Sequence, residues 1–164
     1  MEENTLILPT VMSFLQEYAA EVERVYKESL TDSDHIASRD LYNSISTTVE
    51  VDGQAYYVRM TLEDYWKYIE EGTRPHWPPP SALLRWIEVK PVIPRPDGRG
   101  RIPTPQQLAY LIGRKIAREG TEGTHDLART VEEVNLQFEQ RLQDALAQDC
   151  AESAHAWLLE FLAR

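Results

Sequence analysis

The first clear pattern along the chain is helical and covers residues 10–30. Apolar side chains recur there every three or four positions, and charged side chains fill most of the other positions. This spacing predicts an α-helix with one apolar face. Thr10 can cap its first turn, and the polar stretch 31–34 ends it. The apolar positions are Val11, Phe14, Leu15, Tyr18, Val22, Val25 and Tyr26.

A β-hairpin is predicted over residues 46–61, after a short helical turn at 38–44. Two runs rich in β-branched and aromatic residues are separated there by Asp52-Gly53. An Asp-Gly pair favours a two-residue turn, because that turn needs positive φ angles.

Three helices are predicted after the hairpin. They cover residues 62–71 before Gly72, the segment from Ser81 to about residue 89, and the segment from Thr104-Pro105 to Gly120. Residues 91–103 are predicted to form a second hairpin or a long loop, because prolines interrupt their apolar positions.

The C-terminal region carries two apolar stripes at helical spacing. The first starts at a capping box, Thr130 to Glu133, and the second starts at Ala154, out of phase with the first. We therefore expect a kink or break near Asp149–Cys150. The predicted fold class is α+β, with an antiparallel sheet packed against helices and a long C-terminal helical region.

The length predicts a single domain over 1–164, with a core at 10–125 and a helical extension at 126–164. Hydrophobic residues make up 42% of the chain, which is enough for a packed core. The inward phase of each element predicts the core members Leu41, Ile45, Val49, Val58, Tyr65, Ile69, Trp86, Leu108, Leu111 and Ile112.

Charge is distributed unevenly along the chain, which has a formal net charge of −10. Residues 73–125 carry nine basic and four acidic side chains, whereas residues 1–72 carry 5 basic and 15 acidic, and residues 126–164 carry three basic and eight acidic. Nine of the ten prolines also lie between Pro75 and Pro105. An acidic chain is a poor general binder of nucleic acid, but its basic middle can contact an anionic surface.

Sequence signals for other classes of protein are weak. The single cysteine, Cys150, cannot form an internal disulfide and suits a reducing compartment. No apolar run approaches the ~20 residues of a membrane span, and the acidic start is not that of a secretory signal, so we expect no membrane partner.

We expect no enzymatic activity, no cofactor and no metal. The four histidines lie in four different predicted elements, and no nucleophile–base or phosphate-binding motif is present. The adjacent Glu70 and Glu71 point ~100° apart on a helix, so they do not form a carboxylate pair. Asp32, Asp34 and His35 are the one candidate metal group, and a polar turn after a helix explains them as well.

The candidate interaction residues lie in the basic, proline-rich middle of the chain. They are Arg74, His76, Trp77, Lys90, Arg95, Arg99 and Arg101. The arginine loop can neutralise phosphates of a nucleic acid, or it can dock on an acidic protein surface. His76 and Trp77 can stack on a base, or Trp77 can fill a structural role with His76 at its rim.

Three segments carry a resemblance to a known family. They are Leu41-Tyr42-Asn43-Ser44-Ile45, Tyr65-Trp66-Lys67-Tyr68-Ile69-Glu70-Glu71-Gly72-Thr73 with the following Pro/His loop, and Arg114-Lys115-Ile116-Ala117-Arg118-Glu119-Gly120-Thr121. Over residues 38–125 the chain resembles the tail-completion, or neck, proteins of long-tailed bacteriophages. The stretch 90–105 is longer than in that pattern, and the C-terminal helical region extends beyond it.

The resemblance implies a non-catalytic structural protein of the virion. Such a protein folds in the cytoplasm of the bacterial host and assembles as a ring at the head–tail junction. Its partners would be copies of itself and other neck, portal-side or tail-tube proteins, with passive contact to packaged DNA. The alternative from the residues alone is a nucleic-acid-binding module that uses the arginine loop with His76 and Trp77. The acidic and basic segments suit a ring, because a ring needs two different complementary surfaces on each copy.

Overall fold

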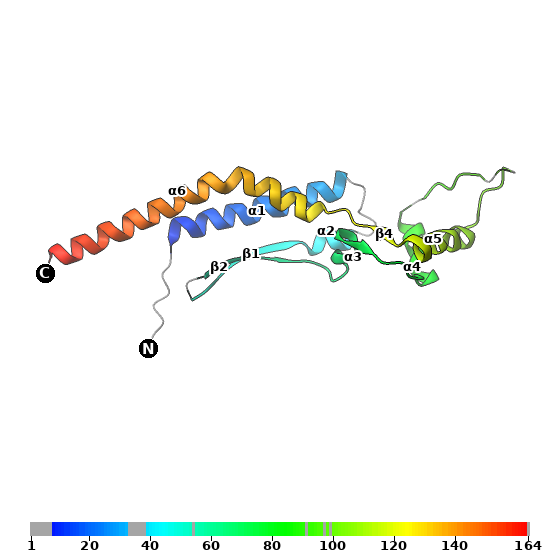
Figure 1. Ribbon diagram of the computed structural model, residues 1–164, viewed down its shortest axis with the longest axis horizontal. Coiled ribbons are helices and arrows are strands. Elements are labelled where there is room, and N and C mark those ends of the chain that lie inside the picture. The colour runs from blue at the N-terminus through cyan, green and yellow to red at the C-terminus, as the bar shows by residue number, and fades with distance from the viewer. Residues whose placement is uncertain are drawn as a thin grey trace. The chain divides into compact units, whose positions relative to one another are not determined.

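The computed structural model describes residues 8–32, 39–53, 55–90, 92–96, 98 and 100–163. The chain has an α+β fold with two small antiparallel sheets of two strands each, as predicted. The helices are α1 (Pro9–Asp32), α2 (Asp40–Ser44), α3 (Trp66–Glu70), α4 (Pro80–Val89), α5 (Pro105–Glu119) and α6 (Asp126–Leu162). The strands are β1 (Ser46–Asp52), β2 (Ala55–Thr61), β3 (Gly72–Thr73) and β4 (Thr121–Glu122) (Figure 1).

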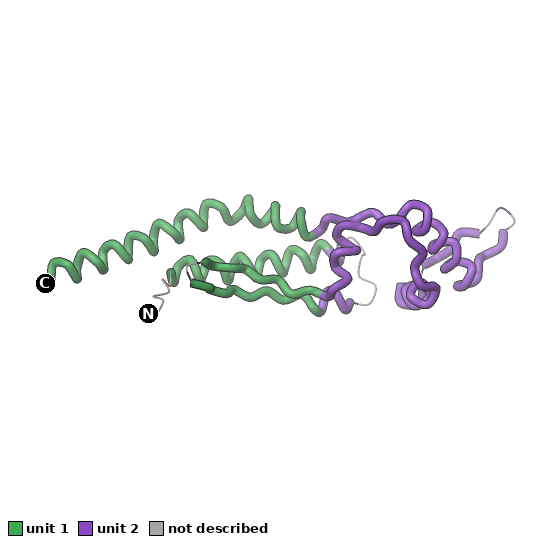
Figure 2. Tube along the Cα trace, turned by 60° about the horizontal axis from the view of Figure 1, so that its bottom comes forward, with its two compact units in different colours: residues 1–29, 44–62, 127–164 green, residues 30–43, 63–126 purple. Residues whose placement is uncertain are grey.

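Two compact units make up the chain, and each is assembled from separate segments (Figure 2). Unit 1 contains residues 1–29, 44–62 and 127–164, and unit 2 contains residues 30–43 and 63–126. The boundary near residue 126 agrees with the start of the C-terminal region. That region is nevertheless an integral part of unit 1, because α6 supplies half of its core.

The core of unit 1 lies between α1 and α6, which run antiparallel. Phe138 of α6 packs against the rings of Phe14 and Tyr18, with ring centroids 5.8 and 5.7 Å apart. Val134, one turn before Phe138, is completely buried. The buried cluster consists of Val11, Phe14, Val22, Val134, Phe138 and Ala145. The predicted apolar stripes of both helices therefore face each other.

Of the predicted kink or break near Asp149–Cys150, the break is wrong, because α6 is continuous from Asp126 to Leu162. No glycine or proline occurs between Thr124 and the end of the chain, and five alanines between residues 145 and 156 favour helix. The change of phase between the stripes instead separates two parts of one helix. The first part packs on α1, and every described residue from 150 onward is exposed.

The β1–β2 hairpin forms as predicted. Strand β1 pairs with β2 from Ser46↔Thr61 to Asp52↔Ala55, and Gly53 in the turn has φ +60°. Alternate residues of each strand are exposed, and the other face, which includes Val49 and Val58, is half-buried. In Figure 1 this hairpin and α6 lie on opposite sides of α1. An isolated hairpin is marginal in water, so its contacts with α1 support it.

Unit 2 differs from the prediction in two ways. The second sheet is formed by β3 and β4 and not by residues 91–103. Of the two predicted alternatives for 91–103, a hairpin or a long loop, the described residues form the loop. In unit 2 the core prediction is right for the buried Leu41 but wrong for Tyr65, Trp86 and Leu111, which are exposed, while Ile45 in unit 1 is buried as predicted. For Trp86 and Leu111 the reason is that α4 and α5 pack on each other, which leaves their remaining apolar side chains at the surface.

Among the described residues, no helix combines the length and the hydropathy needed to cross a bilayer.

Candidate interaction surface

A pair of glycine-rich segments closes the base of unit 2. The triplet Glu-Gly-Thr occurs at 71–73, 119–121 and 122–124. The first triplet pairs with the other two through β3 and β4, in the register Gly72↔Glu122 and Thr73↔Thr121. The hydroxyl groups of Thr73 and Thr121 lie 2.9 Å apart and share a hydrogen bond. The motifs that carry the family resemblance therefore meet across 48 residues of sequence.

Glycine is required on both sides of this pairing. Gly72 and Gly120 each have φ +75°, which side chains rarely adopt. A Cβ atom on Gly72 would lie 2.1 Å from the carbonyl oxygen of Thr121, and one on Gly120 would lie 2.0 Å from that of Thr73. Beyond β4, the N–H of Thr124 donates to the carbonyl of Ile69 at 2.9 Å. We call residues 69–73 with 120–125 the glycine clamp.

The glycine clamp holds the end of α5 beside the segment that leads to α4. Helix α5 starts at a capping box, in which Thr104 and Gln107 exchange hydrogen bonds, and it ends at Gly120. Helix α4 starts at Pro80, whose fixed φ suits a first helical turn. Local sequence signals therefore set both ends of α5 and the start of α4.

A groove opens between α4 and α5. It has a volume of about 210 Å³, and we call it the α4–α5 groove. Trp77 and Tyr110 form its aromatic wall, with ring centroids 5.7 Å apart and planes tilted by 58°. Trp77 lies over Gly113, where an added Cβ would be 3.7 Å from its ring. The groove is lined by Trp77, Pro78, Pro80, Leu83, Leu84, Gln106, Ala109 and Tyr110.

The sequence prediction identified Trp77 but missed Tyr110, Ala109 and Gly113. Ala109 and Gly113 are small residues four positions apart, so they lie on one face of α5 and allow α4 to approach closely. That spacing was a usable signal. The aromatic contact of Tyr110 with Trp77 depends on tertiary packing, and the sequence carried no sign of it.

Two groups of the predicted interaction residues are separated in unit 2. Arg74, His76 and Trp77 lie on the segment that leads into the groove wall, and the Nδ1 atom of His76 lies 2.9 Å from the carbonyl of Arg74. Lys90 ends α4, and Arg95 and Arg101 lie on the loop that follows, where both are exposed. Arg99 lies outside the described residues.

The loop between α4 and α5 buries little of its own apolar surface. Ile93 is 91% exposed and Ile102 is 66% exposed. Figure 1 shows the described parts of this loop extending away from both helices. Ile93 and Ile102 therefore have little cover from the described residues of unit 2.

In the described residues, no group of three His, Cys, Asp or Glu side chains is placed to hold a metal ion. Of the candidate metal group, Asp32 is exposed at the end of α1, while Asp34 and His35 lie outside the described residues.

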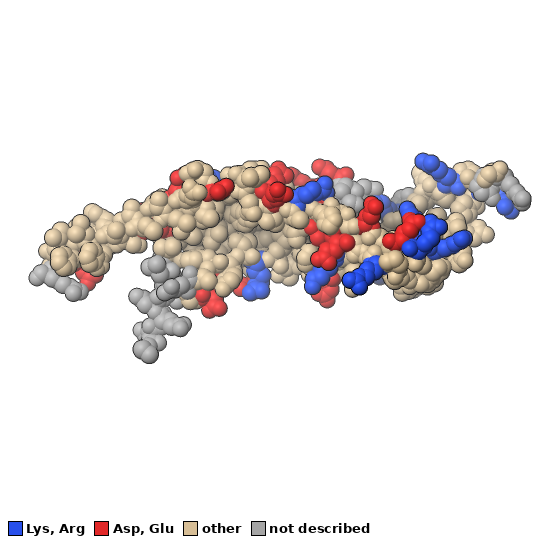
Figure 3. Space-filling view, viewed as in Figure 1, with Lys and Arg blue, Asp and Glu red and all other residues tan. Residues whose placement is uncertain are grey.

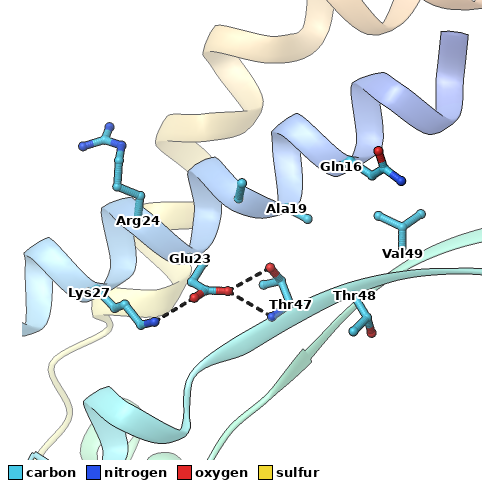
Figure 4. A pocket seen from close by; sticks show the side chains of 9 residues that line it. Gln16, Ala19, Glu23, Arg24, Lys27, Thr47, Thr48 and Val49 are labelled. Atoms are coloured by element: carbon cyan, nitrogen blue, oxygen red, sulfur yellow. Dashed lines mark hydrogen bonds and ion pairs between the residues drawn. The ribbon is translucent and has the colours of Figure 1, made fainter.

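Unit 1 has a shallow hollow of about 430 Å³ between α1 and β1 (Figure 4). The small side chains of Ala19 and Ala20 leave this space against β1. Glu23 lies at its edge and accepts hydrogen bonds from Lys27 at 2.7 Å and from the backbone and hydroxyl of Thr47 at 3.0 Å. The hydrogen bond from Lys27 lowers the pKa of Glu23, with burial opposing it and Thr47 adding to it. This carboxylate therefore connects α1 to the hairpin, which is a structural role.

A second carboxylate of unit 1 caps a helix from far along the chain. The two oxygens of Asp149 accept hydrogen bonds from the backbone N–H groups of Thr10, at 3.1 Å, and Val11, at 2.8 Å. Burial raises the pKa of Asp149, but the hydrogen bonds from Val11 and Thr10 together outweigh it, so the pKa is lowered from 3.8. The predicted cap of α1 was Thr10; the side chain that binds these N–H groups is Asp149.

Beyond Asp149, α6 continues past the start of α1. We call residues 150–162 the α6 tip. Trp157 is 65% exposed and Phe161 is 63% exposed, and their rings stack with centroids 5.7 Å apart. Leu158, Leu159 and Leu162 are exposed as well. The second predicted stripe is thus an apolar surface that no described residue of unit 1 covers.

Comparisons were made with models of protein families, with curated proteins and with solved structures. None of the three gives a match to this chain, so its function has to be inferred from its own residues.

Proposed function

We propose that this chain is a structural protein of a tailed bacteriophage, a neck or tail-completion component that joins head and tail as part of a ring. In this proposal the protein has no catalytic role. It folds in the cytoplasm of the host and is then incorporated at the head–tail junction of the virion.

The observation that carries the proposal is the glycine clamp. The Glu-Gly-Thr segments that resemble the neck family are far apart in sequence, yet they pair with each other and support the α4–α5 groove. A chance likeness of short motifs would not require them to meet. The resemblance therefore falls on residues with one shared structural task.

The surface of unit 2 also suits a protein that works through contacts. The segment 74–118 holds nine basic and two acidic residues and includes the exposed aromatic residues Trp77, Trp86 and Tyr110. Aromatic and arginine side chains are the residue types that contribute most to protein–protein interfaces. The flanking parts of the chain are acidic, which gives neighbouring copies complementary surfaces.

A nucleic-acid-binding role is the second candidate, and the exposed arginines of the 90–104 loop favour it. Trp77 packs against Gly113 of α5 and lies beside the tilted ring of Tyr110, which reduces the area on which a base could stack. Protein docking therefore explains the surface better.

The direct test is a nonsense mutation in the gene within its phage. We expect full heads and complete tails that remain separate in electron micrographs of the lysate. A copy of the gene supplied in trans should restore joined particles. Joined, infectious particles without this protein would contradict the proposal.

A further inference from the structure

We propose that the α6 tip of one copy of this chain docks in the α4–α5 groove of a second copy. The inference builds on the ring proposed above, because it names the two surfaces by which neighbouring copies would meet. It rests on three properties of these surfaces, namely apolar exposure, size and charge.

The α6 tip is an apolar surface that the described part of unit 1 leaves uncovered. Asp149 binds the first N–H groups of α1, so α6 extends past the point at which α1 can cover it. Every described residue from 150 to 163 is exposed, including Trp157 and Phe161. Large contiguous apolar patches on a protein surface usually mark interaction sites.

The side chains of the tip are arranged for insertion into a groove. Trp157 and Phe161 are one turn apart, and their ring planes differ by only 18°. Leu158 and Leu162 are spaced in the same way beside them. Anchors at i and i+4 are typical of an amphipathic helix that binds a hydrophobic groove. The existing ring stack reduces the entropy lost when these anchors are ordered.

The α4–α5 groove has the size and lining for such an anchor. Its volume of about 210 Å³ is below the roughly 300–1,000 Å³ of typical small-molecule sites. It can hold one large side chain or two smaller ones. Its aromatic wall, formed by Trp77 and Tyr110, offers the tilted ring contacts that aromatic side chains prefer.

Charge identifies the groove, rather than a second tip, as the partner of the tip. The α6 tip carries two acidic residues, Glu152 and Glu160, and no lysine or arginine. Two tips would therefore bring only acidic groups together, whereas a basic surface would attract the tip. Around the groove, Arg114 lies one turn after Tyr110 on α5, and Arg74 precedes Trp77 by three residues. Figure 3 shows the last part of α6 as largely uncharged, with a red group near its end, and shows basic side chains gathered over α4 and α5.

Such a contact joins two different surfaces, so it is heterologous. Each copy would use its tip toward one neighbour and its groove toward the other. Heterologous contacts produce closed rings when the rotation between copies closes, and open filaments when it does not. The contact therefore supplies the type of interface that a ring requires.

The test uses two variants of the full chain that each lose one surface. Trp157→Ala with Phe161→Ala removes the anchors of the tip, and Tyr110→Glu places an acidic group in the groove. All three residues are exposed, so we expect both variants to fold, which circular dichroism will check. Association is followed by sedimentation velocity up to about 1 mM protein, where a contact with a Kd of about 1 mM is still detectable.

We expect the native chain to form oligomers that grow with concentration and each variant alone to associate at least tenfold more weakly. An equimolar mixture of the two variants should form dimers that do not grow, because one intact tip and one intact groove remain. The matched controls are Leu159→Ala on the other face of the tip and Leu111→Ala beside Tyr110 on α5, and both should associate like the native chain.

The proposal is overturned by a native chain that stays monomeric at about 1 mM, or by folded variants that associate normally. It is also overturned if only the tip variant loses association, since that result indicates pairing between tips. The two proposals can also fail separately. If the mixed variants form dimers but the nonsense mutant still produces joined particles, the contact between copies is supported and the neck role is rejected. If the folded variants associate normally and the nonsense mutant produces separate heads and tails, only the contact between copies is rejected.

Discussion

Nine of the twelve buried apolar residues in the described chain lie in unit 1, and the other three, Leu30, Leu41 and Ala109, lie in unit 2. The two units therefore achieve their structure by different means. Unit 1 has a conventional core in which α1 and α6 interdigitate through aromatic side chains. Unit 2 has little core of its own, and backbone features hold its elements in place: the glycine clamp, the capped start of α5 and the prolines around α4.

This difference indicates where partners bind. Unit 2 leaves Trp77, Trp86 and Tyr110 exposed, whereas in unit 1 five of the large exposed apolar residues lie together on the α6 tip. A surface that is rigid because of its backbone can present apolar side chains without needing them for folding. Substitutions in the core of unit 1 should therefore change stability, and substitutions on the surface of unit 2 should change assembly.

The largest loss of stability is expected for Phe138→Ala. Phe138 is buried between Phe14 and Tyr18, so its removal leaves a cavity between α1 and α6. The free energy of unfolding should fall by about 3–5 kcal/mol in chemical denaturation. Leu136→Ala, on the exposed face of the same helix, should stay within about 0.5 kcal/mol of the native chain. Equal effects of the two substitutions would contradict the placement of the core.

The next largest effect is expected in unit 2 for Gly72→Ala. A strained φ costs about 1–3 kcal/mol, and the contact with the carbonyl of Thr121 adds to it. Amide hydrogen exchange should become faster in β3 and β4, while α1 and α6 stay protected. Gly53→Ala tests the strained φ alone, because its added Cβ meets nothing within 4 Å, and Gly98→Ala has neither problem. If Gly98→Ala has as large an effect as Gly72→Ala, the clamp is not what supports unit 2.

A smaller, pH-dependent effect is expected for Asp149→Asn. The hydrogen bonds to Thr10 and Val11 lower the pKa of Asp149 below 3.8, so the ionised form stabilises the folded state. This contribution is fully present above about pH 3.8 and is lost as the pH falls through the lowered pKa. The stability difference between native chain and variant should therefore be constant near neutral pH and shrink below pH 3.8.

The control for this experiment is Asp144→Asn, since Asp144 is exposed on the same helix. It should leave the acid limb of the stability curve almost unchanged. A constant difference between Asp149→Asn and the native chain down to pH 2 would show that Asp149 does not cap α1 through its charge.

The parts of the fold that depend on neighbours in sequence were predictable. Asp52-Gly53 indicated the hairpin, and Thr104-Pro105 and Gly120 indicated the two ends of α5. These signals work because a turn or a cap is decided by the φ angles and hydrogen bonds of a few consecutive residues.

The parts that depend on distant residues were not predictable in the same way. The cap by Asp149 crosses 138 residues, and the glycine clamp joins segments 48 residues apart. Strands of two residues, such as β3 and β4, are too short to show the alternation of apolar and polar residues that predicts a strand. The three Glu-Gly-Thr triplets were visible in the sequence, but only the structure shows that they pair. The exposure of Trp86 likewise depends on which helices pack around it. The helical spacing of apolar residues in its own segment does not specify those neighbours.

The smallest change in stability, with a large change in assembly, is expected for Arg95→Glu combined with Arg101→Glu. Both side chains are exposed on the 90–104 loop, so the free energy of unfolding should stay within about 0.5 kcal/mol of the native value. If the loop docks on an acidic protein surface, the reversed charges should prevent the joining of heads and tails, which electron microscopy of the lysate measures. Lys67→Glu reverses an exposed charge of unit 2 outside the loop and should leave the joining of heads and tails intact.

Joined particles that lose their DNA or fail to eject it would instead place Arg95 and Arg101 against packaged DNA. Because both kinds of contact weaken in salt, the type of particle formed, rather than its salt response, separates them.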